Sequence, residues 1–266
     1  MISMLKSQIR RLLPADAALG VLAAAHWGRG RRCPVCGARV RRFLPSGYSY
    51  RVLHELRVVG GGRRADDECP VCRANNRTRL LYLYLRDHTR LFEGGERTLH
   101  IAPERAIVLK ARSLPAETYV CGDIDPHRYL SLRSMVHLDI EALSFADESF
   151  DLIICNHVLE HVNDDRKAMR ELWRALKPSG RAILQVPIAE RLKETREDPS
   201  VVSPEDREEV FGQSDHVRLY AAEDYIARLT DAGFRVQLFD IYQEDPESAY
   251  AFDVNPYEQL FICWRA

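Results

Sequence analysis

The sequence predicts an α/β protein in which a largely parallel sheet, with helices on both faces, follows a small module built around four cysteines. Two patterns indicate this. From Arg97 onward, short apolar runs alternate with amphipathic stretches. Before that, two Cys-Pro-Val-Cys segments begin at Cys33 and Cys69. A length of 266 residues, 46% hydrophobic and 29% charged, suits one large or two modest domains and excludes a disordered, collagen-like or coiled-coil chain.

The alternation also predicts the order of the elements. Strand and helix in turn imply right-handed crossovers and parallel strands that are buried on both faces. Ligands of such sheets bind beyond the carboxyl ends of the strands, so we expect the chemistry there. The expected strands are 99–102, 118–122, 136–140, 151–156 and 181–186, and the expected helices are 104–113, 164–176 and 222–232.

We divide the chain into a helical segment at 1–30, a four-cysteine module with a linking helix at 31–92, and a sheet domain at 93–266. Within the module, 48–59 is typical of a strand, Gly60 to Gly62 of a turn, and 75–92 of an amphipathic helix. Residues 188–220 form an insertion, and its charged part, 190–209, is either a lid over the substrate or a solvated surface excursion.

Membrane insertion and secretion are not expected. The most apolar N-terminal stretch, 19–27, is too short to span a bilayer and has no cleavage site after it. We therefore expect a cytoplasmic protein without a membrane partner.

The net charge of −1 hides an asymmetry between the two parts of the chain. Residues 1–90 hold 18 Lys and Arg against 6 Asp and Glu, whereas the rest hold 20 against 33. The basic part could attract nucleic acid, or it could pair with the acidic part of the same molecule.

The cysteine spacing predicts a structural zinc site. Two residues between the cysteines of a tight turn direct both sulfurs to one point, and two such turns supply four thiolates. A fully ligated ion has no open position for catalysis. A redox or disulfide role is the alternative, although it does not explain a second copy of the turn. The predicted ligands are Cys33, Cys36, Cys69 and Cys72; Cys121, Cys155 and Cys263 lie in apolar runs and are expected to be buried.

Carboxylates stand at the ends of two predicted strands. Asp123 follows the second strand, where it could accept hydrogen bonds from the two hydroxyls of a ribose. Asp139 at the third strand end could accept the exocyclic amine of an adenine. Both could instead serve only as turn residues.

The stretch 143–162, LSFADESFDLIICNHVLEHV, is more specific, and KPSG follows it at Lys177 to Gly180. From Arg97 to the C-terminus the chain resembles the class I S-adenosylmethionine-dependent methyltransferases. The resemblance implies a Rossmann-like, seven-stranded, mostly parallel sheet, S-adenosylmethionine as cofactor, and methyl transfer as the activity.

The first loop departs from the family pattern. The family usually has a glycine-rich turn after the first strand, but here the sequence is LHIAPE, with Ala102, Pro103 and Glu104 in the turn. Pro103 removes a backbone donor, and Glu104 adds an anion. Glu104 either pairs with the α-amino group of the cofactor or caps the next helix.

The resemblance assigns the remaining cofactor contacts by position. Asp123 is matched to the ribose ligand, with Ile124 and Asp125 beside it. Asp139 and Ile140 are matched to the adenine contacts. Asn156 and His157 are expected at the rim between cofactor and acceptor, while Leu159 and His161 could equally be packing residues.

Methyl transfer from a sulfonium is an in-line displacement, so it depends mainly on holding the acceptor against the methyl group. A protonated acceptor also needs a base, and His157 and His216 are the two candidates. The segment around His216 is rich in polar side chains at a place where methyltransferases often carry a substrate lid. The expected substrate contacts are Gln213, Asp215, His216, Arg218 and Tyr220.

Three functions remain open from the sequence. The first is methyl transfer to a small-molecule or saccharide-like acceptor, with the zinc module shaping the acceptor site. The second is methylation of RNA, with the basic module binding phosphates. The third is a zinc-containing scaffold that has lost catalysis. The sequence does not indicate an oligomeric state.

Overall fold

The computed structural model describes residues 15–129 and 134–265. Its centre is a seven-stranded sheet in the order β14-β15-β10-β9-β6-β7-β8, in which β15 is antiparallel to its neighbours and the other pairs are parallel. The predicted Rossmann-like methyltransferase sheet is thereby confirmed. The strands are β6 (Thr98–Ile101), β7 (Tyr119–Asp123), β8 (Val136–His137), β9 (Phe150–Asn156), β10 (Leu176–Gln185), β14 (Phe234–Phe239) and β15 (Leu260–Arg265).

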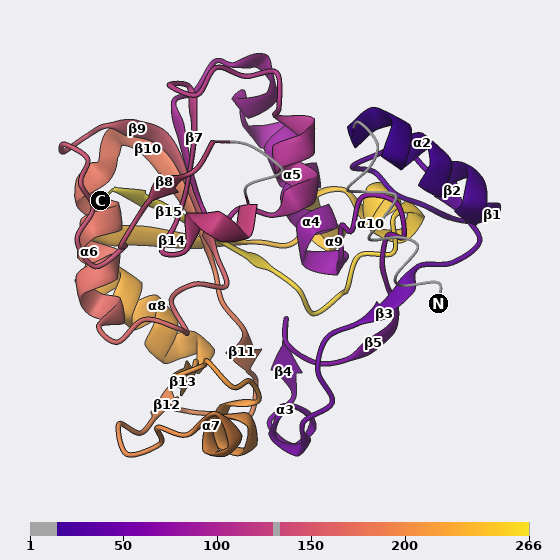
Figure 1. The fold of residues 1–266 in the computed structure, drawn as a ribbon. Coiled ribbons are helices and arrows are strands. Elements are labelled where there is room, and N and C mark those ends of the chain that lie inside the picture. Colours follow the sequence, from indigo (N-terminus) through magenta and orange to yellow (C-terminus); the bar gives the residue numbers. More distant parts are fainter. Residues whose placement is uncertain (1–14, 130–133, 266) are drawn as a thin grey trace.

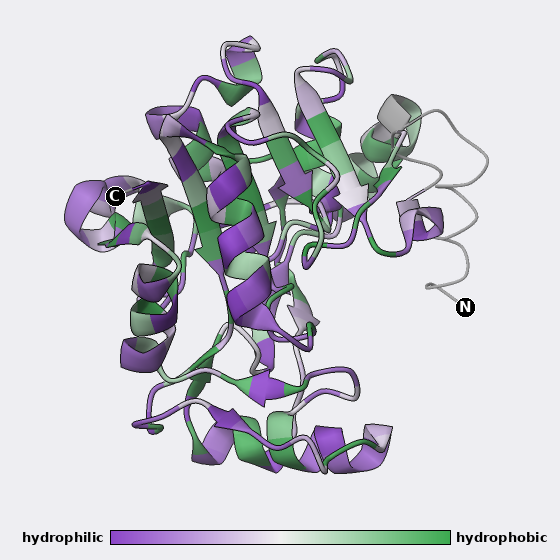
Figure 2. Ribbon diagram, turned by 90° about the vertical axis from the view of Figure 1, so that its left-hand side faces the viewer, coloured by the Kyte–Doolittle hydropathy of each residue, from purple (hydrophilic) through white to green (hydrophobic). Residues whose placement is uncertain are grey.

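Helices cover both faces of this sheet, as Figure 1 shows. The alternation of side chains along β9 explains why. Leu152 and Ile154 pack into one apolar cluster with α4 and α5, whereas Ile153 and Cys155 pack into a second cluster with α6 and α8. The strands are accordingly hydrophobic and the outer helix faces hydrophilic (Figure 2). These helices are α4 (Asn76–His88), α5 (Arg105–Lys110), α6 (Asp165–Ala175) and α8 (Ala222–Asp231).

The strand order reverses next to β6. The chain first passes outward from β6 to β7 and β8, then returns to place β9 on the other side of β6. The crevice at such a reversal is where open α/β sheets bind ligands. The sheet topology therefore directs attention to the ends of β6, β7 and β9.

The five predicted strands and three predicted helices of the sheet domain occur within a few residues of their expected positions, although β8 is short. The predicted strand at 48–59 is wrong. The segment contains the helix α3 (Arg51–Glu55), followed by β4 (Val58–Val59). In a helix the consecutive Val52 and Leu53 both pack into one apolar cluster, whereas a strand would send them to opposite faces.

The insertion at 188–220 is built from regular elements. Its charged part, 190–209, leads into α7 (Pro204–Phe211), whose first turn is capped by Ser203 and which ends at Gly212 in a left-handed conformation. Residues 188–189 pair with the module, because β11 is antiparallel to β4. The short strands of the insertion are β11 (Ile188–Ala189), β12 (Arg196–Glu197) and β13 (Arg218–Leu219).

Module and insertion share a small apolar core of their own. Val52, Leu53 and Val58 of the module pack with Ala189, Phe211 and Leu219 of the insertion. Figure 1 shows the two segments together at the bottom of the molecule, with β4 and α3 beside β11 and α7. Two segments more than a hundred residues apart in sequence are thus held as one lobe below the sheet.

The N-terminal region packs on the cysteine turns. Leu22 of α2 (Ala15–His26) belongs to the same apolar cluster as Cys33 and Cys69, and this cluster continues to α4 and the sheet. Residues 1–14 of the predicted N-terminal helix lie outside the described part. Within that part, the structure contains no helix of sufficient length and apolarity to cross a membrane.

The other elements are β1 (Trp27–Arg32), β2 (Arg39–Val40), β3 (Leu44–Ser46), β5 (Arg64–Glu68), η1 (Leu91–Glu93), η2 (Pro126–Tyr129), α9 (Ile241–Glu244) and α10 (Pro246–Ala251).

We predict that Leu53→Ala lowers the free energy of unfolding by about 3 kcal/mol, because truncation of a buried leucine leaves a cavity. Leu53 is 4% exposed and joins module to insertion. Val202→Ala, at a 69% exposed position of the same insertion, is the control and should change stability little. Denaturant unfolding gives both values. Hydrogen exchange should also increase in α7 for Leu53→Ala, and unchanged exchange there would contradict a shared core.

Candidate functional site

The register of the sheet brings three predicted residues to one edge. Ile101 of β6 is paired with Gly122 of β7 and with Cys155 of β9. The next residues are Ala102, Asp123 and Asn156, so they follow their strands at the same level. The structure thus places three of the expected cofactor contacts side by side at the strand reversal.

Glu104 lies in the middle of this edge. Its carboxylate contacts His100 Nε2 at 2.6 Å and accepts a hydrogen bond from Asn156 Nδ2 at 3.1 Å. His100 is completely buried, and its Nδ1 contacts the hydroxyl of Tyr119 at 2.6 Å. Although burial alone would raise the pKa of Glu104, the hydrogen bond and charge of His100 lower it, so the group is held as an anion. Glu104 makes no side-chain cap to α5, which leaves its carboxylate to the site.

Ala102 stands at the start of the first loop in a backbone conformation that glycine usually adopts. Its φ of 47° lies in the left-handed region that glycine normally occupies, and its amide donates to the carbonyl of Gly122 at 2.8 Å. Pro103 is buried directly after it. The turn therefore keeps a glycine-like conformation with an alanine side chain.

Asp123 is 5% exposed and held from two sides. One carboxylate oxygen accepts from the amide of Asp125 at 2.7 Å, and the other from the hydroxyl of Tyr129 at 3.1 Å. Each oxygen has a second lone pair, so two further hydroxyl donors can be accommodated. Ile124 beside it is 62% exposed, an apolar side chain in contact with solvent at the expected position of the cofactor.

The two predicted adenine contacts are placed differently. Asp139 is exposed, and its carboxylate accepts from the backbone amide of Glu141 at 2.8 Å, as in an Asx turn. Ile140 is buried at 4% exposure and packs in the sheet core. Both stand on the same side of the edge as Asp123, after the neighbouring strand β8.

A cavity of 910 Å³ lies next to this edge, between the module and the sheet domain. Its lining comes from segments far apart in sequence: the 46–64 loops, the start of α4, the turn after β9, the insertion and the 255–258 loop. Arg57, Arg63, Arg64 and Arg77 contribute basic groups, and Asp67, Glu160, Glu190 and Glu258 contribute acidic ones. The cavity is large enough for a metabolite-sized ligand.

His157 joins the cavity to the strand edge. It follows Asn156 directly, adopts a left-handed φ of 54°, and lines the cavity with a side chain that is 15% exposed. Its Nδ1 is 3.1 Å from Glu160 Oε1. Arg77 Nη1 lies about equally far from both ring nitrogens, 2.9 Å from Nδ1 and 3.0 Å from Nε2. Burial and the Arg77 guanidinium lower the pKa of His157, which favours the neutral imidazole near pH 7.

The module reaches His157 through its glycine turn. Gly60 has a φ of 88°, and a Cβ at this position would lie 3.3 Å from both His157 Cε1 and Glu258 Oε1. The Gly60 carbonyl accepts from Arg77 Nη1 at 2.6 Å. The turn thus brings the backbone of Gly60 close to the His157 ring, and a larger residue at this position would obstruct that approach.

The expected lid residues divide into two groups. Gln213 and His216 line the cavity. Of the two residues after β9 that were open between packing and site, His161 lines the cavity and Leu159 is fully buried in the core. Asp215 is exposed and accepts from Gln213 Nε2 at 2.7 Å. Burial lowers the pKa of His216 to about 4.

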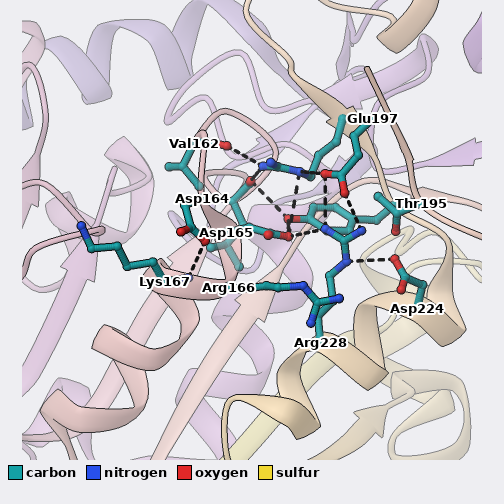
Figure 3. Close-up of polar contacts among 12 residues, drawn as sticks. Val162, Asp164, Asp165, Arg166, Lys167, Thr195, Glu197, Asp224 and Arg228 are labelled. Carbon is teal, nitrogen blue, oxygen red and sulfur yellow. Dashed lines mark hydrogen bonds and ion pairs between the residues drawn. The ribbon is translucent and has the colours of Figure 1, made fainter. Parts of the chain in front are cut away.

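Arg218 and Tyr220, expected to contact the substrate, are not brought to the cavity. Both are buried, and the Tyr220 hydroxyl donates to Asp165 Oδ2 at 2.7 Å. Arg218 donates to Glu197 at 3.0 Å and to backbone carbonyls of the turn before α6. Figure 3 shows this network, in which Arg228 lies between Asp165, Glu197 and Asp224. We therefore correct their assignment, because they anchor the insertion to α6 and α8.

The sequence interpretation missed Glu160, Arg77 and His100. Glu160 lies three residues after His157, a spacing that places both side chains on one side of a turn, and this was an available signal. Arg77 and His100 gave no signal, since one belongs to an ordinary amphipathic helix and the other to a strand. Burial alone would raise the pKa of Glu160, but the hydrogen bond from His157 lowers it to about 2.

The four predicted zinc ligands converge. The four sulfur atoms lie within 4.8 Å of one another. Cys33 Sγ is 3.7 Å from Cys72 Sγ, and Cys36 Sγ is 3.8 Å from Cys69 Sγ. A tetrahedral zinc with bonds of about 2.3 Å requires sulfur separations of about 3.8 Å. The two cysteine turns have similar backbone conformations: the residue after each cysteine pair, Gly37 or Arg73, has a positive φ. The donor set fits zinc.

Some arginines of the basic N-terminal part form ion pairs with carboxylates of the acidic part of the chain. Arg57 of the module pairs with Glu190 of the insertion at 3.2 Å, and Arg31 lies 3.7 Å from Asp253. Arg31 also pairs with Asp66 of the module at 2.6 Å. Both of the open interpretations of the basic segment retain support, because these contacts involve only some of its arginines.

Comparison with known proteins identifies part of the chain. Residues 104–184 match the family model of a methyltransferase domain. A 44-residue stretch is 50% identical to an uncharacterized methyltransferase, YcgJ, of Bacillus subtilis, and it covers 16% of this chain and 17% of that protein. Over 143 residues the chain is 33% identical to the ubiquinone/menaquinone biosynthesis C-methyltransferase UbiE of Pectobacterium atrosepticum, covering 51% of this chain and 53% of that protein. The chain thus spans about half of the length of these relatives, or less.

Among solved structures, an S-adenosylmethionine-dependent methyltransferase of Mesorhizobium loti is 16% identical with a TM-score of 0.45, and the match covers 69% of this chain and 97% of that one. The protein titled YcgJ of Bacillus subtilis is 21% identical with a TM-score of 0.40, over 60% of this chain and 69% of that one. The match to the methyltransferase-domain model covers the part that holds β7, β8, β9 and most of β10.

We predict that Arg228→Met lowers the free energy of unfolding by about 3 kcal/mol, because it removes the closer of the two cations beside the buried Asp165 and leaves only Arg218, whose Nε is 3.9 Å away. The Arg228 and Asp165 side chains are 7% and 5% exposed and 2.9 Å apart. Arg166→Met on the neighbouring helix is the matched control, since Arg166 and Asp231 form an exposed pair worth less than about 1 kcal/mol. Equal losses in denaturant unfolding would refute an anchoring role for the network.

Proposed function

We propose that this protein transfers the methyl group of S-adenosylmethionine to a small-molecule or saccharide-like acceptor bound in the 910 Å³ cavity. The observation that carries the proposal is the position of His157. It lines the cavity, while the adjacent Asn156 contacts Glu104 at the strand edge. Two sites for two different ligands therefore meet at consecutive residues, as methyl transfer requires.

The residues at the strand edge fit the cofactor. Asp123 would accept the two ribose hydroxyls through the free lone pairs of its carboxylate. Glu104 would pair with the α-amino group of the methionine moiety, and Ile124 would pack against the adenine. Ala102 in its glycine-like conformation lets the backbone come close. When bound, the cofactor supplies an activated methyl group and a good leaving group.

The protein then has to position the acceptor and remove a proton from it. If His157 is neutral and donates from Nδ1 to Glu160, its Nε2 is left as an acceptor, with Arg77 Nη1 3.0 Å away. An acceptor hydroxyl that displaces Arg77 from this nitrogen could give its proton to His157. Glu160 would hold the ring in the required tautomer and orientation. His157 is thus the candidate base, and His216 lies further along the cavity wall.

In this proposal the module is structural but essential to the acceptor site. Zinc bound by the four cysteines would hold both turns together, and the adjoining loops provide one side of the cavity. The Gly60 turn against His157 is the nearest point of contact with the reaction.

Methylation of RNA is the second candidate, supported by the basic N-terminal part. A cavity lined by equal numbers of arginines and carboxylates favours a small acceptor over a polyanion. A scaffold without catalysis would not require His157 and Glu160 to be paired beside Asn156. We therefore rank small-molecule transfer first.

We predict that S-adenosylhomocysteine binds the protein and that Asp123→Ala weakens binding by at least 10-fold, since two charge-assisted hydrogen bonds are lost. Calorimetric titration measures this affinity. Asp231→Ala is the matched control, because Asp231 is a 70% exposed carboxylate of α8 outside the predicted site, and the affinity should not change. If the unaltered protein does not bind S-adenosylhomocysteine, the proposed methyl transfer is wrong and the catalytically inactive scaffold is favoured.

Acceptor class is then tested with methyl-labelled S-adenosylmethionine. We would incubate the protein with the small-molecule fraction and with the RNA fraction of a cell extract, using Asp123→Ala as the blank. Label in small molecules supports the proposal. Label that precipitates with RNA, together with loss of binding at higher salt, would transfer support to the RNA candidate.

We predict that Cys36→Ser reduces the zinc content to below half an equivalent and lowers the yield of folded protein, because the fourth thiolate of the cluster is lost. Elemental analysis gives the metal content. Cys263→Ala, at a buried thiol of the sheet remote from the cluster, is the control and should retain the full zinc content. Full zinc content in Cys36→Ser would exclude a four-thiolate site.

A further inference from the structure

A second group of potential metal ligands stands on the wall of the acceptor cavity. Glu160, His161 and His216 each offer one ligand atom, and these atoms lie within 4.8 Å of one another. All three residues line the cavity. They come from the turn after β9 and from the insertion, and the amide of Val217 donates to the Glu160 carbonyl at 2.9 Å, which holds the two segments together.

Two atoms of this group are buried without a hydrogen-bond partner in the described part of the chain. They are Glu160 Oε2 and His216 Nδ1. Glu160 is 1% exposed and His216 is 5% exposed. A buried polar atom without a partner costs roughly 1–3 kcal/mol, and a carboxylate oxygen costs more. A cation at this point would satisfy the carboxylate.

The atoms that would not bind the ion are already engaged. His157 Nδ1 lies 3.1 Å from Glu160 Oε1, and His161 Nδ1 lies 3.2 Å from the backbone carbonyl of Asp215. If His161 donates from Nδ1 to that carbonyl, its Nε2 is left as an acceptor, 4.0 Å from Glu160 Oε1. Metal-binding histidines are commonly oriented in this way, by a carbonyl or carboxylate on the other nitrogen.

The geometry needs only a small closure. Ligand atoms around a first-row divalent ion lie about 3 to 4 Å apart, given bonds of about 2.1 Å. The rings of His161 and His216 are already in edge-to-face contact, with centroids 4.7 Å apart. His161 is the most exposed of the three, at 27%, and is therefore the side chain with room to move.

We propose that Glu160, His161 and His216 bind a divalent transition-metal ion whose open positions face the cavity. Two imidazoles and one carboxylate suit zinc, iron, cobalt or nickel better than magnesium or calcium. Three protein ligands leave positions that a second molecule can fill. The ion would accept an oxygen pair from the acceptor, such as a hydroxyl beside a carboxylate or a vicinal diol.

This inference rests on the proposed function only for the statement that the cavity binds the acceptor. The site lies on the His157 side of the cavity wall, so an acceptor chelated there would be held close to the candidate base. It is distinct from the four-cysteine cluster in its donor atoms, which are nitrogen and oxygen instead of sulfur. Spectroscopy can therefore tell the two sites apart.

The test is titration with Co²⁺ of the protein carrying one equivalent of zinc, enough for the four-cysteine cluster alone, without cofactor or acceptor. We expect one equivalent to bind with the visible absorption of nitrogen and oxygen ligation and without thiolate-to-cobalt charge transfer. Glu160→Gln should weaken binding by 100-fold or more, and His161→Asn by 10-fold or more. His54→Asn, at another histidine of the cavity, is the control and should bind as the unaltered protein does.

Absence of a bound equivalent in the unaltered protein would overturn the site, as would unchanged affinity in both Glu160→Gln and His161→Asn. Charge-transfer absorption would show exchange into the cysteine cluster and would also overturn it. Because Glu160 is buried, thermal unfolding must show that its variant is folded; the more exposed His161 gives an independent test.

Open positions on the ion are tested with acetohydroxamate, which binds metals through two oxygens. It should shift the cobalt spectrum of the unaltered protein, and an unchanged spectrum would overturn the open positions. Cobalt binding together with no binding of S-adenosylhomocysteine would remove the proposed methyl transfer but retain the metal site. Binding of S-adenosylhomocysteine without binding of cobalt would remove the metal site but retain the proposed methyl transfer.

Discussion

The arrangement of module and sheet depends on one buried guanidinium. Arg79 of α4 is completely buried, lies over the Phe43 ring at 4.4 Å, and donates to the backbone carbonyls of Asp67, Phe252 and Asp253. A buried charge is tolerated only when its donors are satisfied, so these carbonyls cannot separate without a large cost. The second cysteine turn is thereby attached to the segment that leads into β15. The four-cysteine module and the sheet form one continuous core as a consequence.

This attachment sets the position of everything that the module presents to the site. The Gly60 turn can contact His157 because β4 pairs with β11 at one end of the loop and Arg77, on the same helix as Arg79, binds the Gly60 carbonyl at the other. The insertion is fixed from the opposite side by the buried network in Figure 3. The cavity thus lies between two anchored walls.

Two histidine–carboxylate pairs divide the site. His100 holds Glu104 at the end of β6, and His157 holds Glu160 after β9. In each pair an imidazole keeps a carboxylate in place at the edge of the sheet; His100 is fully buried and His157 is half-buried. The first pair faces the expected cofactor and the second faces the cavity. Asn156, which contacts Glu104 and precedes His157, links them.

The sequence by itself determined the sheet, the four-cysteine cluster and the residues at the strand ends, because these follow from local patterns: hydrophobic period, two-residue cysteine spacing, and polar residues after apolar runs. It could not place Arg77 or Gly60 beside His157, nor show that Arg218 and Tyr220 are buried away from the cavity. It also misjudged 48–59, where tertiary packing of Val52 and Leu53 decides for a helix. Only the tertiary structure decided these points, since each depends on contacts between segments more than fifty residues apart. Local sequence carries no information about which distant surface will cover it.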